Sequence, residues 1–258
     1  MKKAAAIAGG VVALWLVALV VLDATMADRE ARRVEQRLGE TLDARATVGA
    51  TDLALVRGRL AFDQLAVRRD DAVGRLALDV TSVRCELPPL GWALVDGDCG
   101  ELAVRGTRLE ASSGALFHLP RPHRHPIRAE RVVIDDAELA FAPSALVPSL
   151  GRLAIAIDHA EAGATVFRTP LSWIFALDQL RARIELPAGG PVELDYRGGT
   201  LRVTGSLLGA QPVELPVELP DADRAQDARD ELDLLVDTAL QIAERLVAQR
   251  AEDWLRTL

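Results

Sequence analysis

The chain has 258 residues, of which half are apolar but only 4% aromatic, and its formal net charge is −8. This length is enough for one sizeable core, and the acidic balance argues against nucleic acid as a partner. The apolar residues are mostly Leu, Val and Ala, which suit packing or contact with hydrocarbon better than stacking on bases.

The first element is an uncharged apolar run from Ala4 to Leu22, preceded by two lysines and closed by an aspartate. Its length is close to the ~20 residues that a bilayer-spanning helix needs, so it predicts a transmembrane signal-anchor over residues 1–23. A cleaved signal peptide is the alternative, with Thr25-Met26-Ala27 as a weak cleavage site. Basic residues flank both ends, so charge alone does not fix the orientation.

Residues 24–45 are expected to form a membrane-proximal helix with a narrow apolar stripe. A β domain follows over residues 46–220. A Pro-rich, basic stretch at residues 112–126 is interpreted as a loop between two halves of one sheet, because strand-like sequence resumes directly after it.

The chain is predicted to end in a helix over residues 221–258, whose apolar positions recur at helical spacing. Pro220 and Asp221 would supply a stop and an N-cap, with Asp223 in the first turn. The other face is rich in Asp and Glu, so an anionic membrane surface would repel it. The apolar stripe is expected to contact the sheet, the first helix or another protein.

A short phrase recurs through the β region. Arg59-Leu60-Ala61-Phe62 returns with small changes at residues 75–78, 101–104, 131–134 and 152–155. Each copy alternates large apolar with small or charged residues, as in a strand buried on one face.

Several copies then slip by one position. The apolar set of one strand passes from Leu60 and Phe62 to Leu65 and Val67, and similar slips follow Val80 and Ile134. An uncorrected slip would turn the second set to solvent, whereas a β-bulge would keep both sets on one face and bend the strand. The pattern predicts a mainly β fold, a curved antiparallel sheet that forms a groove or half-barrel with one apolar side.

The apolar positions of these strands are candidates to line a groove for lipid, together with one tryptophan further along the chain. They are Leu60, Phe62, Leu76, Leu78, Val80, Leu102, Val104, Val132, Ile134, Leu139, Phe141 and Trp173. The tryptophan lies in an apolar stretch, residues 169–177, that is expected to form a short helix or lid touching a ligand or partner. As a single aromatic residue in a β domain, it is alternatively part of the core.

Cys85 and Cys99, the two cysteines of the chain, lie at the end of one expected strand and the start of the next. In an oxidising compartment they are expected to form a disulfide, worth about 3 kcal/mol for a loop of about 15 residues. Two buried free thiols are the main alternative, and a metal pair is less favoured because a zinc site needs more ligands.

No residues point to catalysis. His118, His123 and His125 fall in the Pro-rich loop without a carboxylate, so a solvated loop is favoured over a metal site. Asp135 and Asp136 are neighbours on a strand and point to opposite faces, which favours a role at the bulge or turn. No nucleophile-elbow, zinc-protease or phosphate-loop signature occurs. The sequence predicts a non-enzymatic chain without metal or cofactor.

Several stretches of the first 160 residues follow one another in a recognisable order after the anchor and the helix. They are residues 48–55, 58–67 and 76–83, the step from residues 90–97 to residues 101–104, and the strand–acidic turn–strand unit at residues 129–141. Together they resemble the AsmA-like family, as a pattern rather than as invariant residues.

The resemblance implies a single-pass inner-membrane protein with its main domain in the periplasm. Its U-shaped sheet would hold phospholipid or other acyl chains, in lipid transport or outer-membrane biogenesis. Expected partners are therefore lipid, the inner membrane and an envelope protein that docks on the C-terminal helix, but no nucleic acid.

The chain departs from the family in two ways. About nine or ten strands at ~4.8 Å would give a sheet only about 45 Å long, and the chain ends in an acidic helix. Both departures argue against transport by this chain alone. The alternative is a structural subunit of an envelope machine, similar to the N protein of type II secretion, with the groove filled by protein.

Overall fold

The computed structural model describes residues 26–40, 42–54, 58–71, 74–87, 98–112, 127–141, 152–169, 171–186, 190–205, 212–222, 225 and 228–256. The predicted anchor, residues 113–126 of the Pro-rich loop with its three histidines, and the remainder of the chain lie outside the described residues. Within the described part, no helix has both the length and the apolar character needed to cross a membrane.

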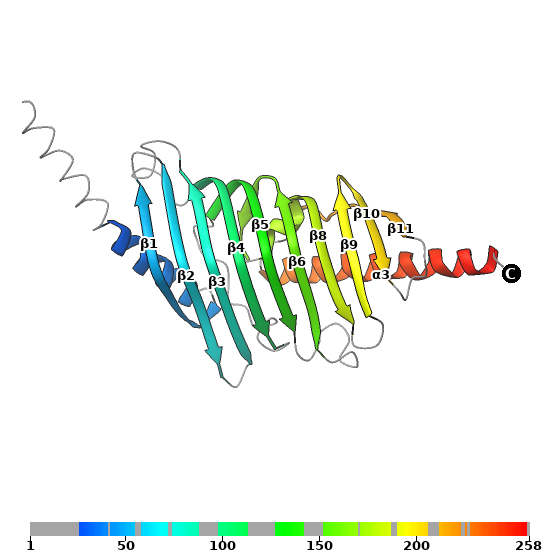
Figure 1. The fold of residues 1–258 in the computed structure, drawn as a ribbon, viewed down its shortest axis with the longest axis horizontal. Coiled ribbons are helices and arrows are strands. Elements are labelled where there is room, and N and C mark those ends of the chain that lie inside the picture. Colours follow the sequence, from blue (N-terminus) through cyan, green and yellow to red (C-terminus); the bar gives the residue numbers. More distant parts are fainter. Residues whose placement is uncertain are drawn as a thin grey trace, which may run out of the picture.

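The chain folds into one open, curved sheet of eleven strands (Figure 1). The order across the sheet is β1-β2-β3-β4-β5-β6-β8-β9-β10-β11, and β7 pairs with β5. The strands are β1 (Arg45–Ala54), β2 (Arg59–Asp70), β3 (Arg75–Glu86), β4 (Asp98–Ala111), β5 (Ile127–Phe141), β6 (Leu153–Ala162), β7 (Thr165–Phe167), β8 (Leu177–Leu186), β9 (Gly190–Arg197), β10 (Thr200–Gly205) and β11 (Val213–Pro216). The mainly β prediction is therefore confirmed.

One pair of strands departs from the predicted antiparallel arrangement. β4 and β5 run parallel, with Asp98 opposite Arg128 and Ala111 opposite Phe141, so the antiparallel prediction is wrong at this pair. Alternation of apolar and polar residues has the same period in both kinds of ladder. It therefore could not reveal the direction of β5. The two strands belong to one sheet, as the interpretation of residues 112–126 requires.

The slips of the apolar pattern line up across the first half of the sheet. From β1 to β6 the pairing skips one residue on each strand, and the skipped residues lie in one row: Gly49, Gln64, Thr81, Gly106, Asp136 and Asp158. We call this row the crease. Both apolar sets of β2 and β5 lie on the same face, as expected, because Phe62, Leu65, Ile134 and Ala137 are all buried.

The slips do not take the expected form of a β-bulge in each strand. A β-bulge sets two residues of one strand against one of its neighbour, but across β1–β6 each strand contributes one skipped residue. The register shifts between β6 and β8, first between Ile157 and His159 and again between Glu161 and Ala162. The residues of β8 opposite Ile157 and His159 are consecutive, so the crease ends at β6.

The crease imposes left-handed backbone at several positions, including Gln64 (φ 55°), Asp136 (φ 57°) and Gly106 (φ 62°). At Gly106 an added Cβ would also overlap the Thr81 hydroxyl and lie 2.8 Å from the Thr81 Cβ. Thr81 Oγ1 donates to the Gly106 carbonyl oxygen at 3.2 Å, so the two residues are held together. Glycine is therefore required here for both space and conformation.

We expect Gly106→Ala to lower the free energy of unfolding by about 2–3 kcal/mol, because left-handed strain and the overlap with Thr81 add. Gly198→Ala is the matched control. Gly198 and Gly199 form the two-residue turn between β9 and β10, with φ 52° at Gly198 and no atom within 4 Å of an added Cβ. Gly198→Ala should lower the free energy of unfolding, measured in urea, by about 1 kcal/mol. Equal losses of unfolding free energy in the two variants would contradict the close contact between Gly106 and Thr81.

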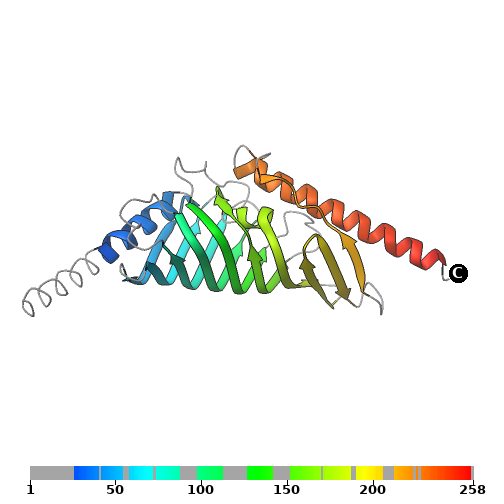
Figure 2. The same ribbon diagram turned by 90° about the horizontal axis from the view of Figure 1, so that it is seen from above.

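Two helices lie on one side of the sheet, one toward each end (Figure 2). The N-terminal helix, residues 26–40, packs Val34 and Leu38 against a cluster that includes Leu65 and Val67. α3 (Ala228–Arg256) spans the β11 end, and its Ile242 and Leu246 pack against the larger core cluster. Both helices therefore lie against the apolar face.

α3 begins later than expected. Its first turn holds Asp230 and Glu231, so the N-cap expected at Asp221 is wrong. Ala222, which precedes α3, is hydrogen-bonded to the connection after β7. Arg168 Nη1 donates to the Ala222 carbonyl oxygen at 2.9 Å. The Ala222 carbonyl oxygen also accepts from the Ala225 N–H, at 3.2 Å, in a short 3₁₀ turn that is separate from α3.

Candidate functional site

The predicted groove residues share one face of the sheet. The register places Leu60, Leu102 and Val132 in one line across the strands and Phe62, Val104 and Ile134 in the next. Of the strand residues predicted to line the groove, the buried ones are Phe62, Leu76, Val80, Val132 and Ile134, and the half-buried ones are Leu60, Leu78, Leu102, Val104, Leu139 and Phe141. The sheet therefore brings all eleven together.

A single line of half-buried side chains crosses the middle and far part of this face. We call it the apolar row; its members are Leu78, Leu109, Leu139, Ile155, Ile184 and Val192. Each residue is directly opposite the next on the neighbouring strand. Five strand spacings of about 4.8 Å make the row ~24 Å long. Four of its members were not predicted as site residues, although they continue the same alternation: Leu109, Ile155, Ile184 and Val192.

The tryptophan of the predicted lid is part of the core. Trp173 lies in the short 3₁₀ helix η4 (Ser172–Ala176) and belongs to the larger core cluster with 6% of its surface exposed. The expectation of a short helix is confirmed. The alternative role as a core residue describes Trp173 better than a place in an open groove.

A buried polar cluster holds α3 to the segment that contains η4. The Glu231 side chain has 2% of its surface exposed, and its oxygens accept hydrogen bonds from Thr169 Oγ1 at 2.7 Å and from Ser172 Oγ at 2.9 and 3.1 Å. Arg168 Nη1 lies 3.9 Å from a Glu231 oxygen and supplies a positive charge. The carboxylate is well satisfied, as a buried charge must be. We call these four residues the latch. None of the four residues was predicted as a site residue.

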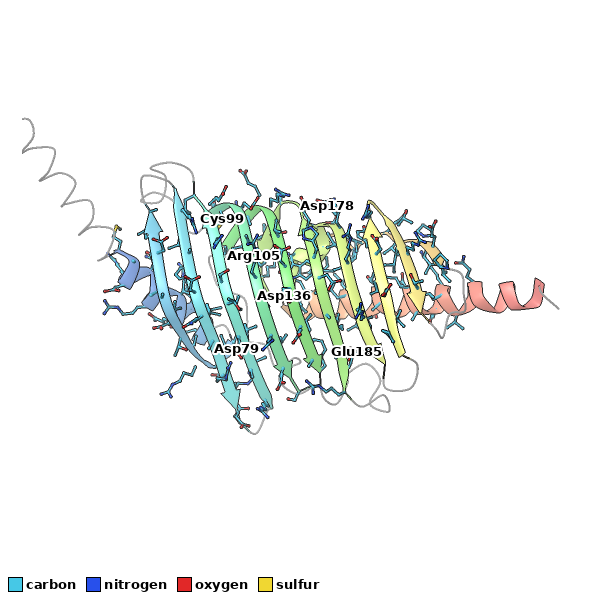
Figure 3. All side chains as sticks on the ribbon, viewed as in Figure 1. Asp79, Cys99, Arg105, Asp136, Asp178 and Glu185 are labelled. Atoms are coloured by element: carbon cyan, nitrogen blue, oxygen red, sulfur yellow. A yellow bond between two sulfur atoms is a disulfide. The ribbon has the colours of Figure 1, made fainter. Side chains whose placement is uncertain are left out.

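The opposite face of the sheet is charged. Cross-strand ion pairs join Arg131 to Glu101 and Glu161, and Arg105 to Asp135, whose carboxylate also lies 2.8 Å from His159 Nδ1. The Glu161 carboxylate, through its hydrogen bond and its charge, raises the pKa of Arg131 above its ordinary value. Figure 3 shows Arg105 beside Asp136 on neighbouring strands near the middle of this face. These exposed pairs favour the register but contribute little stability each.

A small hollow of about 190 Å³ lies on the charged face, over β2, β3 and β4. It is lined by Arg59, Ser82, Arg84, Glu86, Glu101, Ala103 and Arg105. A lining of this kind is unsuited to hydrocarbon, since burial of acyl chains would strip water from charged groups. The hollow is therefore distinct from the apolar row.

The two cysteines form the predicted bridge. Cys85 and Cys99 are disulfide-bonded, with their Cα atoms 5.4 Å apart, and both are buried on the apolar face. The bridge ties the end of β3 to the start of β4. Among the described residues, no cluster of three or more His, Cys, Asp or Glu side chains is arranged to hold a metal ion.

No protein-family model matches the chain, and no curated protein matches it either.

Proposed function

We propose that this protein is a non-catalytic component of the cell envelope that binds acyl chains of phospholipid along the apolar row. The observation that carries the proposal is the row itself, an unbroken line of half-buried aliphatic side chains on six neighbouring strands. Transfer of an acyl chain from water to such a surface is favourable in proportion to the apolar area covered. The row is long and narrow, which fits a hydrocarbon chain better than a compact ligand.

Three features support an envelope location. The apolar run before the described residues has the length of a membrane anchor. The Cys85–Cys99 disulfide is typical of an oxidising compartment. The order of elements resembles the AsmA-like family. We infer a single-pass inner-membrane protein with a periplasmic β domain, acting in lipid transport or outer-membrane biogenesis.

A photoreactive amino acid placed along the strand tests this function. Leu139 and Glu138 are neighbours on β5, but Leu139 belongs to the apolar row whereas Glu138 pairs with Arg108 on the charged face. In the full chain in its membrane, cells labelled with radioactive phosphate should give a phospholipid adduct at Leu139. The same group at Glu138 should give at least tenfold less. Equal labelling at both positions, or none at Leu139, would contradict the proposal.

A second candidate is a structural subunit of an envelope machine, with protein on the apolar face. It is favoured by the deep burial of residues on the same face as the row, such as Val132 and Ala160, each with 1% of its surface exposed. In that case the Leu139 adduct should contain a protein of fixed stoichiometry instead of lipid.

A further inference from the structure

The outward side of α3 carries apolar residues that nothing in the described chain covers. Leu240 and Val247 have 49% and 71% of their surfaces exposed, and Ala243 between them is exposed as well. Spacings of three and four residues place these side chains on one side of a helix. We call them, with the half-buried Val236 that precedes them at the same spacing, the α3 seam. The residues that pack on the sheet, Ile242 and Leu246, point elsewhere on the helix.

α3 also extends past the sheet. In both views its C-terminal part runs beyond β11 (Figures 1 and 2). A helix in water gains most of its stability from packing of an amphipathic face rather than from its own hydrogen bonds. The part of α3 beyond β11 has no strand beneath it in either view. Its stability would therefore increase if another element covered the seam.

The edge of β11 is closed to addition of a strand. The Val217 N–H donates to the Gly199 carbonyl oxygen, at 2.8 Å, so the N–H groups of alternate residues point outward. Two of the three outward positions, Pro212 and Pro216, have no N–H, and Arg245 of α3 caps the Pro216 carbonyl oxygen at 3.2 Å. Proline at such positions blocks edge pairing. A partner at this end of the molecule is therefore not expected to add a strand to the sheet, which leaves the exposed side of α3 as the docking surface.

The charges beside the seam select the kind of helix. Asp237 and Glu244 are exposed on the flank of the seam that faces away from the sheet. In an antiparallel pair with a second copy of α3, these carboxylates would face each other and repel. We propose that the α3 seam docks an amphipathic helix of another envelope protein whose flanking residues are Lys or Arg. This inference does not depend on lipid binding.

Site-specific photocross-linking with a charge-reversal control tests the docking surface. A photoreactive residue replaces Val247 in the full chain, in the cells that produce it, and the matched control replaces Gln241, which is exposed on another side of α3. Mass spectrometry then identifies the cross-linked peptide. We expect an adduct at residue 247 whose partner segment has apolar residues at three- and four-residue spacings with basic flanks.

The double variant Asp237→Lys/Glu244→Lys should reduce the yield of this adduct at least tenfold, and added salt should weaken it in the unmodified chain. If the reversed variant does not fold, Asp237→Asn/Glu244→Gln should give a smaller reduction in the same direction. The proposal is overturned by absence of an adduct, by an adduct between two copies of this chain, by equal yields at residues 241 and 247, or by insensitivity to the flanking charges.

Discussion

Glu231→Ala is expected to lower the free energy of unfolding by about 3 kcal/mol. The change leaves the Thr169 hydroxyl buried without its acceptor and leaves the Ser172 hydroxyl with the Thr169 carbonyl oxygen, at 3.0 Å. A lost hydrogen bond to a charged group and an unsatisfied buried group each cost about 1–3 kcal/mol. It also releases α3 from η4, because Glu231 is the residue of α3 that enters the latch. Urea unfolding of the full chain, followed by circular dichroism, measures the loss.

Asp233→Ala is the matched control for this prediction, because Asp233 lies two residues further along α3 and is exposed. It should change the unfolding free energy by about 0.5 kcal/mol or less. Glu231→Gln separates the effect of shape from that of charge, because it removes the charge and keeps one acceptor oxygen. It should lower the free energy of unfolding by less than Glu231→Ala. If Glu231→Ala and Asp233→Ala had the same effect, the latch would not hold α3.

Removal of the disulfide is the second large effect that we expect. The bridge closes a sequence separation of 14 residues, and loops of this size contribute about 3 kcal/mol by restricting the unfolded chain. Urea unfolding of the unmodified chain with and without reductant should show this difference. The variant Cys85→Ala/Cys99→Ala should be destabilised by a similar amount and should not respond to reductant. If reductant did not change the urea midpoint of the unmodified chain, this would contradict a native disulfide.

Part of this fold could be read from the order of apolar residues. The slips after Phe62, Val80 and Ile134 correctly place two apolar sets on one face, because only one arrangement keeps both away from water. The Gly198-Gly199 turn follows from the conformational freedom of glycine in tight hairpins. Local chemistry decides these features, so the sequence was sufficient.

Other features depend on partners that are distant in sequence. The parallel direction of β5 follows from where the chain re-enters the sheet, and alternation within β5 is the same in either direction. That the slips are in register across six strands is a property of the whole sheet. Neither could be derived from one strand at a time.

The latch shows the same limit for the site. Glu231 is one of the many Asp and Glu residues of the C-terminal helix. The hydroxyl groups that donate hydrogen bonds to it lie about sixty residues earlier, at Thr169 and Ser172. An acidic residue is almost never buried unless it is paired. The acidic composition of the helix therefore favoured a solvent-exposed position for Glu231. The pairing exists only once α3 folds back against η4.

Native mass spectrometry of the full chain, extracted from its membrane, tests the central claim most directly. We predict that the chain retains phospholipid, and that Leu78→Asp and Phe141→Asp, both half-buried positions on the apolar face, remove it while the chain stays folded. Val132→Asp, at 1% exposure, serves as the core control and should unfold the sheet. A chain without lipid, or equal lipid occupancy in the wild type and both half-buried variants, would contradict acyl-chain binding on this face.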